Sequence, residues 1–227
     1  MRVLVWNLFH GRAVPGAGRA LLDEFAARIA GWEWDVALLQ EVPPWWPPEL
    51  ARAAGAEERT ALTSRNELLP LRRAVAVRRP DLIRSNGGGS NALLVRGGSI
   101  AEHRALRLRR FPERRVLQLA RLGDGTHLAN MHLSLSRARA RDELERALAL
   151  AGDGSPLIFG GDLNLRDPVA PGLEHVAARD VDHVFVRGCA LAGEVVRLDR
   201  GLESGGALSD HEALLVPLAP RSPRSAP

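Results

Sequence analysis

Short apolar runs, bounded by turn-forming residues, recur along the whole sequence and constrain its fold more than any other feature. Most are three to seven residues long, which is typical of buried β-strands. They occupy 2–6, 36–39, 92–95, 116–122, 127–133, 157–159, 183–186 and 213–216. Helical periodicity predicts helices over 19–31 and 137–151, and Pro48 opens a short predicted helix over 48–56. Many strands with few helices predict a layered α/β domain.

Three segments interrupt this pattern. The sequence PPWWPP at 43–48 predicts a rigid loop, and the glycine-rich SNGGGSN at 85–91 predicts a mobile one. The end of the chain is rich in proline, serine and arginine, which predicts a flexible tail over 219–227. With 227 residues in all, we expect one domain over 1–218.

Several classes of protein are disfavoured by the sequence. No apolar run approaches the roughly 18 residues that span a bilayer. The first residues lack the apolar region and cleavage site of a signal peptide, so we expect a cytoplasmic location. Cys189 is the sole cysteine, which excludes an internal disulfide and a cysteine-based zinc site.

Positive charge is concentrated in one segment. Residues 72–115 include 12 arginines and three acidic residues, whereas the whole chain has a formal charge of +4. Such a concentration favours an anionic partner, whether nucleic acid, a phosphorylated ligand or a membrane surface. The alternative is that the arginines simply coat an ordinary surface, because the chain contains no lysine.

Polar side chains that suit metal binding or acid–base chemistry follow several predicted strands. They are Asn7, Glu41, His132, Asp162, Asn164, Asp182, Asp210 and His211. Each alone has a structural explanation, such as an Asx turn or a hydrogen-bonded core histidine. Burying all of them is costly unless they pair or hold a cation. Carboxylate and carboxamide oxygens suit Mg²⁺ or Mn²⁺, and histidines can move protons, so together they predict phosphoester hydrolysis.

Seven short motifs occur in a recognisable order. They are WN at 6–7, LQEV at 39–42, SNALLVR at 90–96, NMHLS at 130–134, GGDLN at 160–164, VDHVFVRG at 181–188 and LSDHEALLV at 208–216. They resemble the motifs of the endonuclease/exonuclease/phosphatase superfamily, which includes apurinic-site endonucleases, pancreatic-type deoxyribonucleases, neutral sphingomyelinases and inositol polyphosphate 5-phosphatases. The resemblance spans residues 2–218 and implies a four-layered α/β/β/α sandwich with two packed mixed β-sheets.

The resemblance also implies a metal site and a group that activates water. Asn7, Glu41 and Asp210 match the superfamily's Mg²⁺ or Mn²⁺ site. Asp162 resembles the aspartate that orients or deprotonates the attacking water. Asn164 resembles the asparagine that donates a hydrogen bond to the phosphate.

Two histidines complete the implied catalytic set. His211 resembles the histidine that contacts the phosphate, and Asp182 resembles the acid that fixes its orientation. His132 lies where the deoxyribonuclease branch has a histidine that assists the leaving oxygen. Apurinic endonucleases usually have tyrosine there, and this chain contains no tyrosine.

Three further residues are expected to bind substrate. Arg115 resembles a phosphate-binding arginine of the deoxyribonuclease branch, although a solvated surface role is an alternative. Asn91 lies near where that branch has a glutamate supporting the leaving-group histidine, but no glutamate occurs in 85–96. His10 is expected to line the cleft or its rim.

These observations favour a monomeric, Mg²⁺- or Mn²⁺-dependent phosphodiester hydrolase, with nuclease as the first hypothesis. The basic segment and the Trp45–Trp46 pair, which could stack on a base, favour nucleic acid as the substrate. A lipid-headgroup or inositol-phosphate phosphoesterase of the same fold is the alternative. A non-catalytic module that binds phosphate or nucleic acid is a further one, because fold alone does not imply activity.

Overall fold

The computed structural model describes residues 1–64, 66–80, 82 and 89–221, which form two large β-sheets. The first sheet has seven strands, in the spatial order β12 (Cys189–Leu191), β15 (Ala213–Pro220), β1 (Arg2–Asn7), β3 (Val36–Val42), β5 (Ser90–Val95) and β4 (Glu57–Leu62), with β13 (Val196–Leu198) also paired to β15. Strand β1 is parallel to β3 and antiparallel to β15. The sheet is therefore mixed.

The second sheet has six strands and is also mixed. Its spatial order is β10 (Glu174–Arg179), β11 (Asp182–Arg187), β9 (Leu157–Asp162), β8 (His127–His132), β7 (Arg115–Leu122) and β6 (Ile100–Arg109). Strands β8 and β9 are parallel, and β9 and β11 are antiparallel. A small ladder of β2 (Ala13–Val14) and β14 (Ala207–Leu208) lies apart from both sheets.

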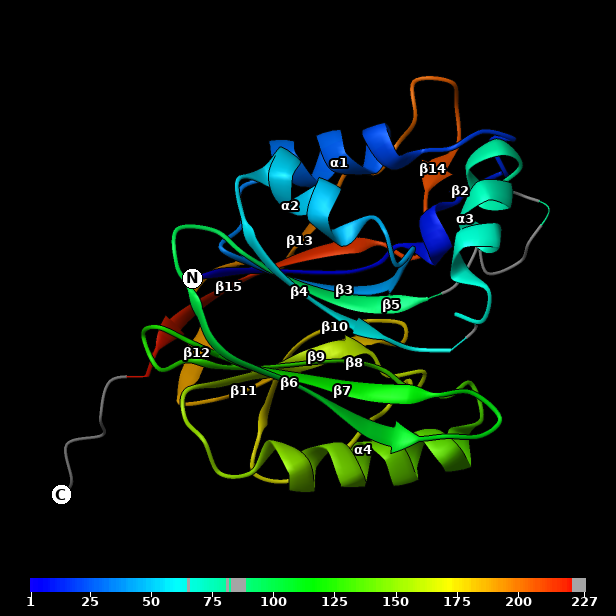
Figure 1. Cartoon of the computed structure of the whole chain (residues 1–227). Coiled ribbons are helices and arrows are strands. Elements are labelled where there is room, and N and C mark those ends of the chain that lie inside the picture. Colours follow the sequence, from blue (N-terminus) through cyan, green and yellow to red (C-terminus); the bar gives the residue numbers. More distant parts are fainter. Residues whose placement is uncertain (65, 81, 83–88, 222–227) are drawn as a thin grey trace, which may run out of the picture.

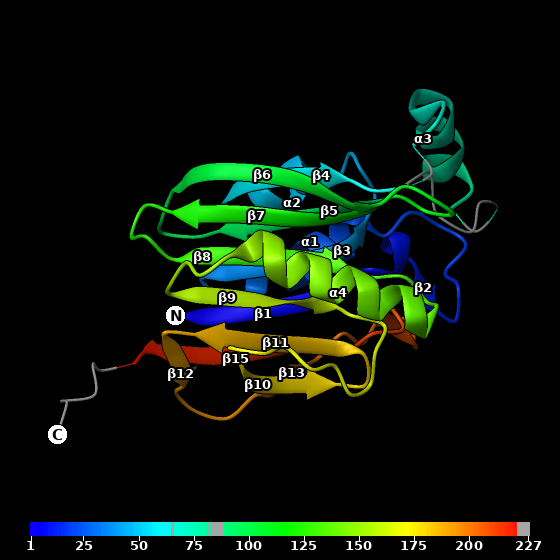
Figure 2. The same cartoon turned by 90° about the horizontal axis from the view of Figure 1, so that it is seen from below.

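Helices cover the outer faces of the two sheets. Figure 1 shows α1 (Leu22–Gly31) and α2 (Pro47–Ala54) over the first sheet, and α4 (Arg137–Ala151) over the second. Helix α3 (Leu69–Arg78) projects beyond the strands, which is clearest in Figure 2. A short 3-10 helix, η1 (Phe9–Gly11), follows β1. The protein is thus the expected four-layered α/β/β/α sandwich.

The central strands read as continuous apolar runs because both of their faces are buried. In β1, Val5 packs between the sheets, whereas Trp6 packs under α1 and α2. In β9, Ile158 faces the other sheet and Phe159 faces α4. Burying each such side chain stabilises the fold by about 1.5–3 kcal/mol. Three apolar layers therefore hold the four structural layers together.

All eight predicted strands and all three predicted helices are present, with ends displaced by a few residues. Helix α1 begins at Leu22 rather than at residue 19, and α4 has the predicted bounds. The short helix α2 ends at Gly55, which has a left-handed φ of 62°. None of the described helices combines the length and apolar character that a bilayer crossing requires.

The three predicted interruptions differ from the structure in part. Pro47 and Pro48 form the first turn of α2, so only part of PPWWPP is a loop. Residues 90–91 of the glycine-rich segment belong to β5, whereas 85–88 lie outside the described residues. Strand β15 continues to Pro220, two residues into the predicted tail, and 222–227 lie outside the described residues. The differences at β5 and β15 arise because the pairing of each strand with its neighbours extends past its apolar run.

Candidate functional site

The sheet topology brings most of the predicted site residues to one end of the sandwich. In the second sheet, Asp162 at the end of β9 lies opposite both His132, the last residue of β8, and Asp182, the first of antiparallel β11. In the first sheet, Asn7 ends β1 beside Gln40 of β3. The two sets of strand ends face each other across the sandwich.

Two local features of the backbone place the carboxylates. The pairing of β3 with β5 shifts register between Leu39 and Val42, and Glu41 within this bulge has a φ of 50°. Bulges redirect a side chain in this way. At the end of β9, a Cβ on Gly160 would lie 2.5 Å from the His183 carbonyl oxygen, and one on Gly161 would lie 2.1 Å from that of Met131. The two glycines before Asp162 therefore let β9 pack closely between its neighbours.

Ser209 ties the loop that carries His211 to the end of β1. Its hydroxyl donates a 2.6 Å hydrogen bond to the Asn7 carbonyl oxygen and accepts a 3.0 Å bond from the His211 amide. Its φ is 63°, and its own amide donates to the Arg12 carbonyl oxygen. The indole of Trp6 also donates to the His211 carbonyl oxygen, at 3.1 Å. Sequence reasoning quoted this serine within LSDHEALLV but gave it no role.

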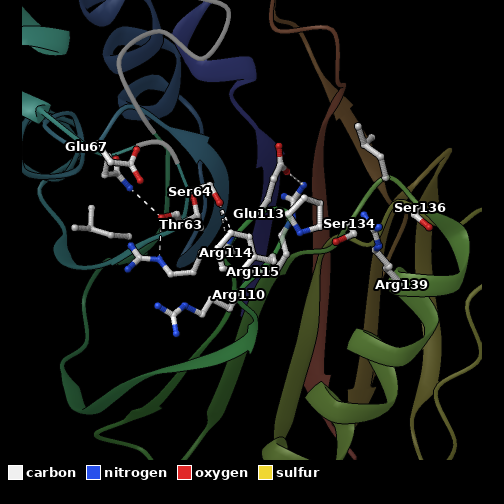
Figure 3. A pocket seen from close by; sticks show the side chains of 15 residues that line it. Thr63, Ser64, Glu67, Arg110, Glu113, Arg114, Arg115, Ser134, Ser136 and Arg139 are labelled. Carbon is white, nitrogen blue, oxygen red and sulfur yellow. Dashed lines mark hydrogen bonds and ion pairs between the residues drawn. The ribbon is translucent and has the colours of Figure 1, made fainter.

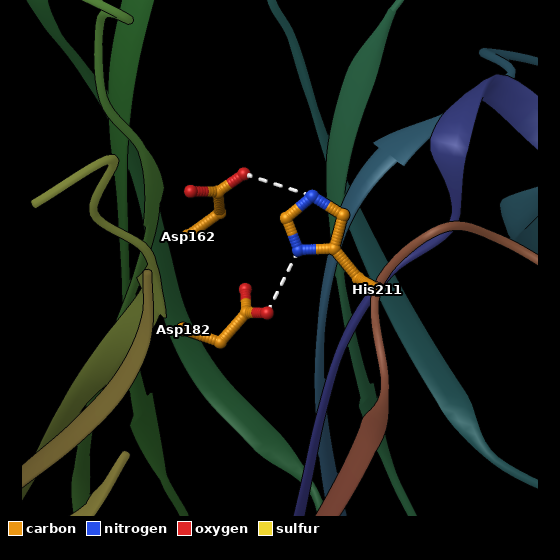
Figure 4. Close-up of side chains that lie close together, drawn as sticks. All are labelled: Asp162, Asp182 and His211. Carbon is orange, nitrogen blue, oxygen red and sulfur yellow. Dashed lines mark hydrogen bonds and ion pairs between the residues drawn. The ribbon is translucent and has the colours of Figure 1, made fainter. Parts of the chain in front are cut away.

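His211 forms a hydrogen-bonded pair with Asp182. Its Nδ1 lies 2.7 Å from Asp182 Oδ2, and its Nε2 lies 3.8 Å from Asp162 Oδ2 (Figure 4). The same Nε2 lies 3.9 Å from Asp210 Oδ1. Burial lowers the pKa of His211, but the hydrogen bond and charge of Asp182, with the charges of the other two aspartates, raise this pKa to about 9. At neutral pH, His211 is therefore an imidazolium with its Nε2–H directed toward Asp162.

Asp162 is held by two amide groups. Asn7 Nδ2 donates to its Oδ2 at 2.8 Å, and the Asn164 backbone amide donates to its Oδ1 at 3.0 Å. Burial, followed by the charge of Asp182, raises the pKa of Asp162 to about 6. The Asn164 side chain donates to the Leu133 carbonyl oxygen at 2.8 Å, which leaves its second N–H for another acceptor. Asp162 is thus a fixed carboxylate that can take up a proton near neutral pH.

Glu41 lies between two histidines. His10 Nε2 is 3.0 Å from Glu41 Oε2, and His132 Nδ1 is 3.7 Å from Oε1. Burial and the charge of Asp162 raise the pKa of Glu41 to about 7. His132 Nε2 is 3.5 Å from Asp162 Oδ2, and burial, together with Arg115, lowers the pKa of His132 well below its usual value. His132 is therefore neutral where His211 is charged.

The histidine–glutamate side of the cluster opens onto a small cavity. Its volume is about 120 Å³, and His10, Glu41, Arg115 and His132 are among its lining residues. Arg115 is buried, and its guanidinium binds Glu113 at 2.5 Å. The predicted substrate residues His10 and Arg115 therefore do lie at the cavity.

Other predictions have different positions. Asn91 is fully buried and donates to the Val116 carbonyl oxygen at 3.4 Å, and it does not line the cavity. Asp210 is exposed, 3.9 Å from His211, and is not among the residues that line the cavity. Trp46 is buried against Phe25. Trp45 is partly buried beside the same core.

A buried amide network lies directly beneath the cluster. Gln40 Nε2 donates to Asn130 Oδ1 at 2.8 Å, and Asn130 Nδ2 donates to Gln118 Oε1 at 3.2 Å. Asn130 Nδ2 also lies 3.1 Å from the Leu39 and Ala92 carbonyl oxygens, so it joins the two sheets. The sequence signal of this network is a polar residue in each of three short segments: Gln40 in LQEV, Gln118 in VLQLARL and Asn130 in NMHLS.

The donor atoms fit a divalent cation. Oxygens of Asp162 and Asp182 and a nitrogen of His211 lie within 4.8 Å of one another. His211 carries its proton between these carboxylates, so this group is already partly neutralised. Glu41 supplies a partly buried carboxylate and Asn7, which pairs in the sheet with Gln40 next to Glu41, supplies an amide oxygen, and such hard oxygens suit Mg²⁺ or Mn²⁺. Asp182 Oδ1 is buried and accepts no hydrogen bond from the described residues, so it too has capacity for a cation or its water.

Comparisons with known proteins show to which family this fold belongs. The sequence matches the endonuclease/exonuclease/phosphatase family over residues 4–211. No curated protein matches it. The structure is similar to an endonuclease/exonuclease/phosphatase from Beutenbergia cavernae DSM 12333, with a TM-score of 0.73 and 18% identity over 97% of this chain and 71% of that one.

Two further solved structures are also similar. TDP2 of D. rerio complexed with a single-strand DNA product gives a TM-score of 0.68 at 16% identity, over 96% of this chain and 98% of that one. A functionally unknown conserved protein of Enterococcus faecalis V583 gives a TM-score of 0.72 at 14% identity, over 97% and 100% of the two chains. At these identities the similarities show the fold alone.

Proposed function

The chain belongs to the endonuclease/exonuclease/phosphatase family, and on that basis we propose that it is a metal-dependent phosphodiester hydrolase, acting as a nuclease. The family fold suggests hydrolysis of phosphoester bonds. The observation that carries the proposal is the pairing of protonated His211 with Asp182, beside the fixed carboxylate of Asp162. Asp162, which can accept a proton, thus lies beside His211, which can donate a hydrogen bond to an anion.

We assign the attacking water to Asp162. Its carboxylate orients the water for in-line attack on phosphorus and accepts the proton that the water releases. The bond from Asn7 and the Asn164 amide hold both carboxylate oxygens, so the base does not rotate away from the substrate. With a pKa of about 6, this carboxylate is mostly ionised at pH 7 and ready to act.

His211 and Asn164 are the donors to the phosphoryl oxygens. The imidazolium Nε2–H and the free amide hydrogen of Asn164 stabilise the charge that grows on these oxygens. Asp182 is a positioning residue, because it fixes the ring and its charge through Nδ1. Neutral His132 donates a hydrogen bond to the leaving oxygen as its bond to phosphorus breaks, and Arg115 and His10 contact the substrate from the cavity. Asn91 of the first sheet supports this substrate contact indirectly, because its side chain donates to the carbonyl oxygen of Val116, next to Arg115 in β7 of the second sheet.

Asn7, Glu41 and Asp210 would hold the Mg²⁺ or Mn²⁺ ion. Glu41 supplies a partly buried carboxylate, Asn7 a buried neutral oxygen and Asp210 a solvent-exposed carboxylate. When bound, the ion supplies charge neutralisation to the phosphoryl group and the leaving oxygen. The raised pKa of Glu41 shows how strongly the protein disfavours its anion, which a cation would offset.

Nucleic acid is the substrate class that the surroundings of the cavity favour. Arg114 and Arg115 line it, and a structural neighbour, TDP2 of D. rerio, is described as complexed with a single-strand DNA product. Not all arginines of the basic segment serve a ligand, however. Arg96 binds backbone carbonyl oxygens of Ala54 and Trp32, and Arg109 pairs with Glu143.

The test is hydrolysis of a substrate panel with and without Mg²⁺. We expect Mg²⁺-dependent cleavage of bis(4-nitrophenyl) phosphate and of single-stranded DNA, and loss of both in Asp162→Asn. Preference for sphingomyelin or an inositol phosphate would replace the nuclease assignment with the alternative. Binding of DNA without any metal-dependent cleavage would show a non-catalytic module and refute the enzyme.

A further inference from the structure

A larger groove continues outward from the catalytic cavity. Its volume is about 910 Å³, against about 120 Å³ for the cavity itself. The two share the residues Thr63, Ser64, Glu113, Arg114, Arg115 and Leu135, so they are continuous. Ligand sites for small molecules have about 300–1,000 Å³. The groove therefore has room for much more of a substrate than its reacting phosphate.

Three structural elements form the groove. Figure 3 shows Thr63 and Ser64 on one side, Ser134 and Arg139 on the other, and the arginines of the β6–β7 connection between them. Arg114 is anchored there, because its Nε donates to the Thr63 carbonyl oxygen at 2.9 Å. Arg114, between the two sides of the groove, is thus held in place by the loop that follows β4.

The lining of the groove is basic. It contains four arginines, at 110, 114, 115 and 139, and two glutamates, at 67 and 113. Arg115 already pairs with Glu113. Among the described residues, neither Arg110 nor Arg139 has a carboxylate within 4 Å, and both are exposed. These two cations are therefore available to an anionic ligand.

The position of Arg139 opposes the electrostatics of its own helix. It lies in the first turn of α4, which contains no acidic residue, and the Ser136 side chain at its N-cap makes no capping bond within the described chain. Cations are disfavoured at a helix N-terminus, whereas anions bind there readily. A phosphate in the groove would be favoured by the helix end and by Arg139 together.

Two apolar side chains stand exposed beside these cations. Phe111 is 73% exposed and Leu135 is 81% exposed, and both line the groove. The Arg110 guanidinium lies 5.9 Å from the centre of the Phe111 ring. Proteins that bind single-stranded nucleic acids combine exposed aromatic rings with basic side chains, because bases stack on the rings while phosphates bind the cations.

We propose that this groove holds the single-stranded nucleic-acid segment flanking the scissile phosphate, with Phe111 stacking on a base and Arg110 and Arg139 binding phosphates. The inference rests on the proposed phosphodiesterase function and specifies its substrate. An unpaired base is required, because bases within a duplex are already stacked and paired. A membrane surface fits less well, because the apolar side chains line a concave, basic groove.

Binding of a labelled 12-residue oligothymidylate, measured by fluorescence anisotropy with chelator present to prevent cleavage, tests the groove directly. Phe111→Ala and Phe111→Leu should both weaken binding by about 5- to 100-fold, since stacking needs the ring and not merely apolar bulk. Arg139→Ala should reduce the slope of log K against log salt by about 0.7, the value for one contact to a single strand. Arg107→Ala is the matched control, because Arg107 is exposed on β6 but does not line the groove.

A structural role for Arg139 would be visible in the melting temperature. Replacing this cation at the helix N-terminus by alanine should leave or slightly raise the melting temperature, while binding weakens. The ratio of kcat/KM for the oligonucleotide to that for bis(4-nitrophenyl) phosphate should fall in Phe111→Ala and stay constant in Arg107→Ala.

The outcomes separate this inference from the proposed function. Wild-type affinity in both Phe111 variants, tighter binding of a duplex than of the single strand, or binding to anionic vesicles instead of DNA would each overturn the groove assignment. If the groove variants lose affinity but the wild type never cleaves the small diester, the groove stands and the hydrolase fails.

Discussion

Replacing Asp182 by asparagine tests the central pair of the site. The substitution keeps the size of the side chain and an oxygen that can accept from His211 Nδ1, but it removes the charge 2.7 Å from the ring. The pKa of His211 should then fall from about 9 toward its ordinary 6.5 or lower, because burial is no longer opposed by this neighbour. We expect the folded structure to persist while the charge state of His211 changes.

The size of the effect follows from the two pKa values. If turnover requires the imidazolium, the active fraction at pH 8.5 falls from about three quarters to about one hundredth, a loss of about 75-fold. At pH 6.5 the same change costs only about two-fold. The variant should therefore be nearly normal in mild acid and nearly inactive in mild alkali.

The measurement is the pH profile of kcat/KM on bis(4-nitrophenyl) phosphate. In the wild type we expect a fall near pH 9 from His211 and a loss below about pH 6 from Asp162. Asp142→Asn is the control, because Asp142 is exposed on α4 and lies 3.5 Å from Arg109, outside the cluster. An alkaline limb that stays near pH 9 in Asp182→Asn would refute the assigned charge on His211.

Stability should follow the same titration with a defined sign. A histidine with a raised pKa in the folded state contributes stability that is present below pH 6.5 and is lost as pH rises through about 9. The melting temperature of the wild type should include a decline across this window. In Asp182→Asn that component should be absent, which thermal melts between pH 6 and 10 can detect.

Further predictions concern the base, the metal and the scaffold. Asp162→Ala and His211→Ala should each lower kcat by at least about 10²- to 10³-fold with an unchanged circular-dichroism spectrum; near wild-type rates in either variant would defeat the assignment. Glu41 has a pKa raised to about 7, so stability is lost as pH rises from its ordinary 4.5 through 7. Mg²⁺ should therefore raise the melting temperature more at pH 8 than at pH 5, and equal shifts would place the ion elsewhere. Arg96 donates to the carbonyl oxygens of Ala54 and Trp32 at 2.8 and 2.6 Å. Arg96→Met should therefore lower the free energy of unfolding, measured in urea titrations, by about 2–4 kcal/mol. Arg104→Met is the control and should not lower it, because Arg104 is exposed.

The central strands could be predicted from the sequence because burial on both faces leaves an unbroken apolar run. The longer strands that were missed, β4, β6 and β10, are all edges of a sheet. Strand β6 has only two buried residues, Ile100 and Leu108, and several exposed charged residues between them. It therefore contains no apolar run that could identify it as a strand. Edge strands carry charges that keep them from pairing with other molecules. Their pairing partners, and not their own composition, make them strands.

The sequence predicted which residues come together in the candidate site, but not which of them contact one another. Polar letters at strand ends identified Asp162, Asp182 and His211, because strand ends are where a buried sheet reaches the surface. Which carboxylate binds which group depends on the register between strands and on the distance between the sheets. No spacing in the sequence predicts that His10 lies 3.0 Å from Glu41 or that Asn7 donates to Asp162. The larger groove was missed for the same reason, since it joins three separate segments.

The charges of the cluster favour Glu41 over the two aspartates as the place for the proposed cation. Asp162 and Asp182 share the proton on His211, so part of their negative charge is already offset within the protein. The charges of His211 and Arg115 lower the pKa of Glu41, yet burial and the charge of Asp162 still raise it to about 7. A partly buried carboxylate that resists ionisation lowers stability in the metal-free protein, whereas a divalent cation bound to it would offset that loss. On this reasoning, a group that lowers stability in the absence of metal is one that gains when metal binds.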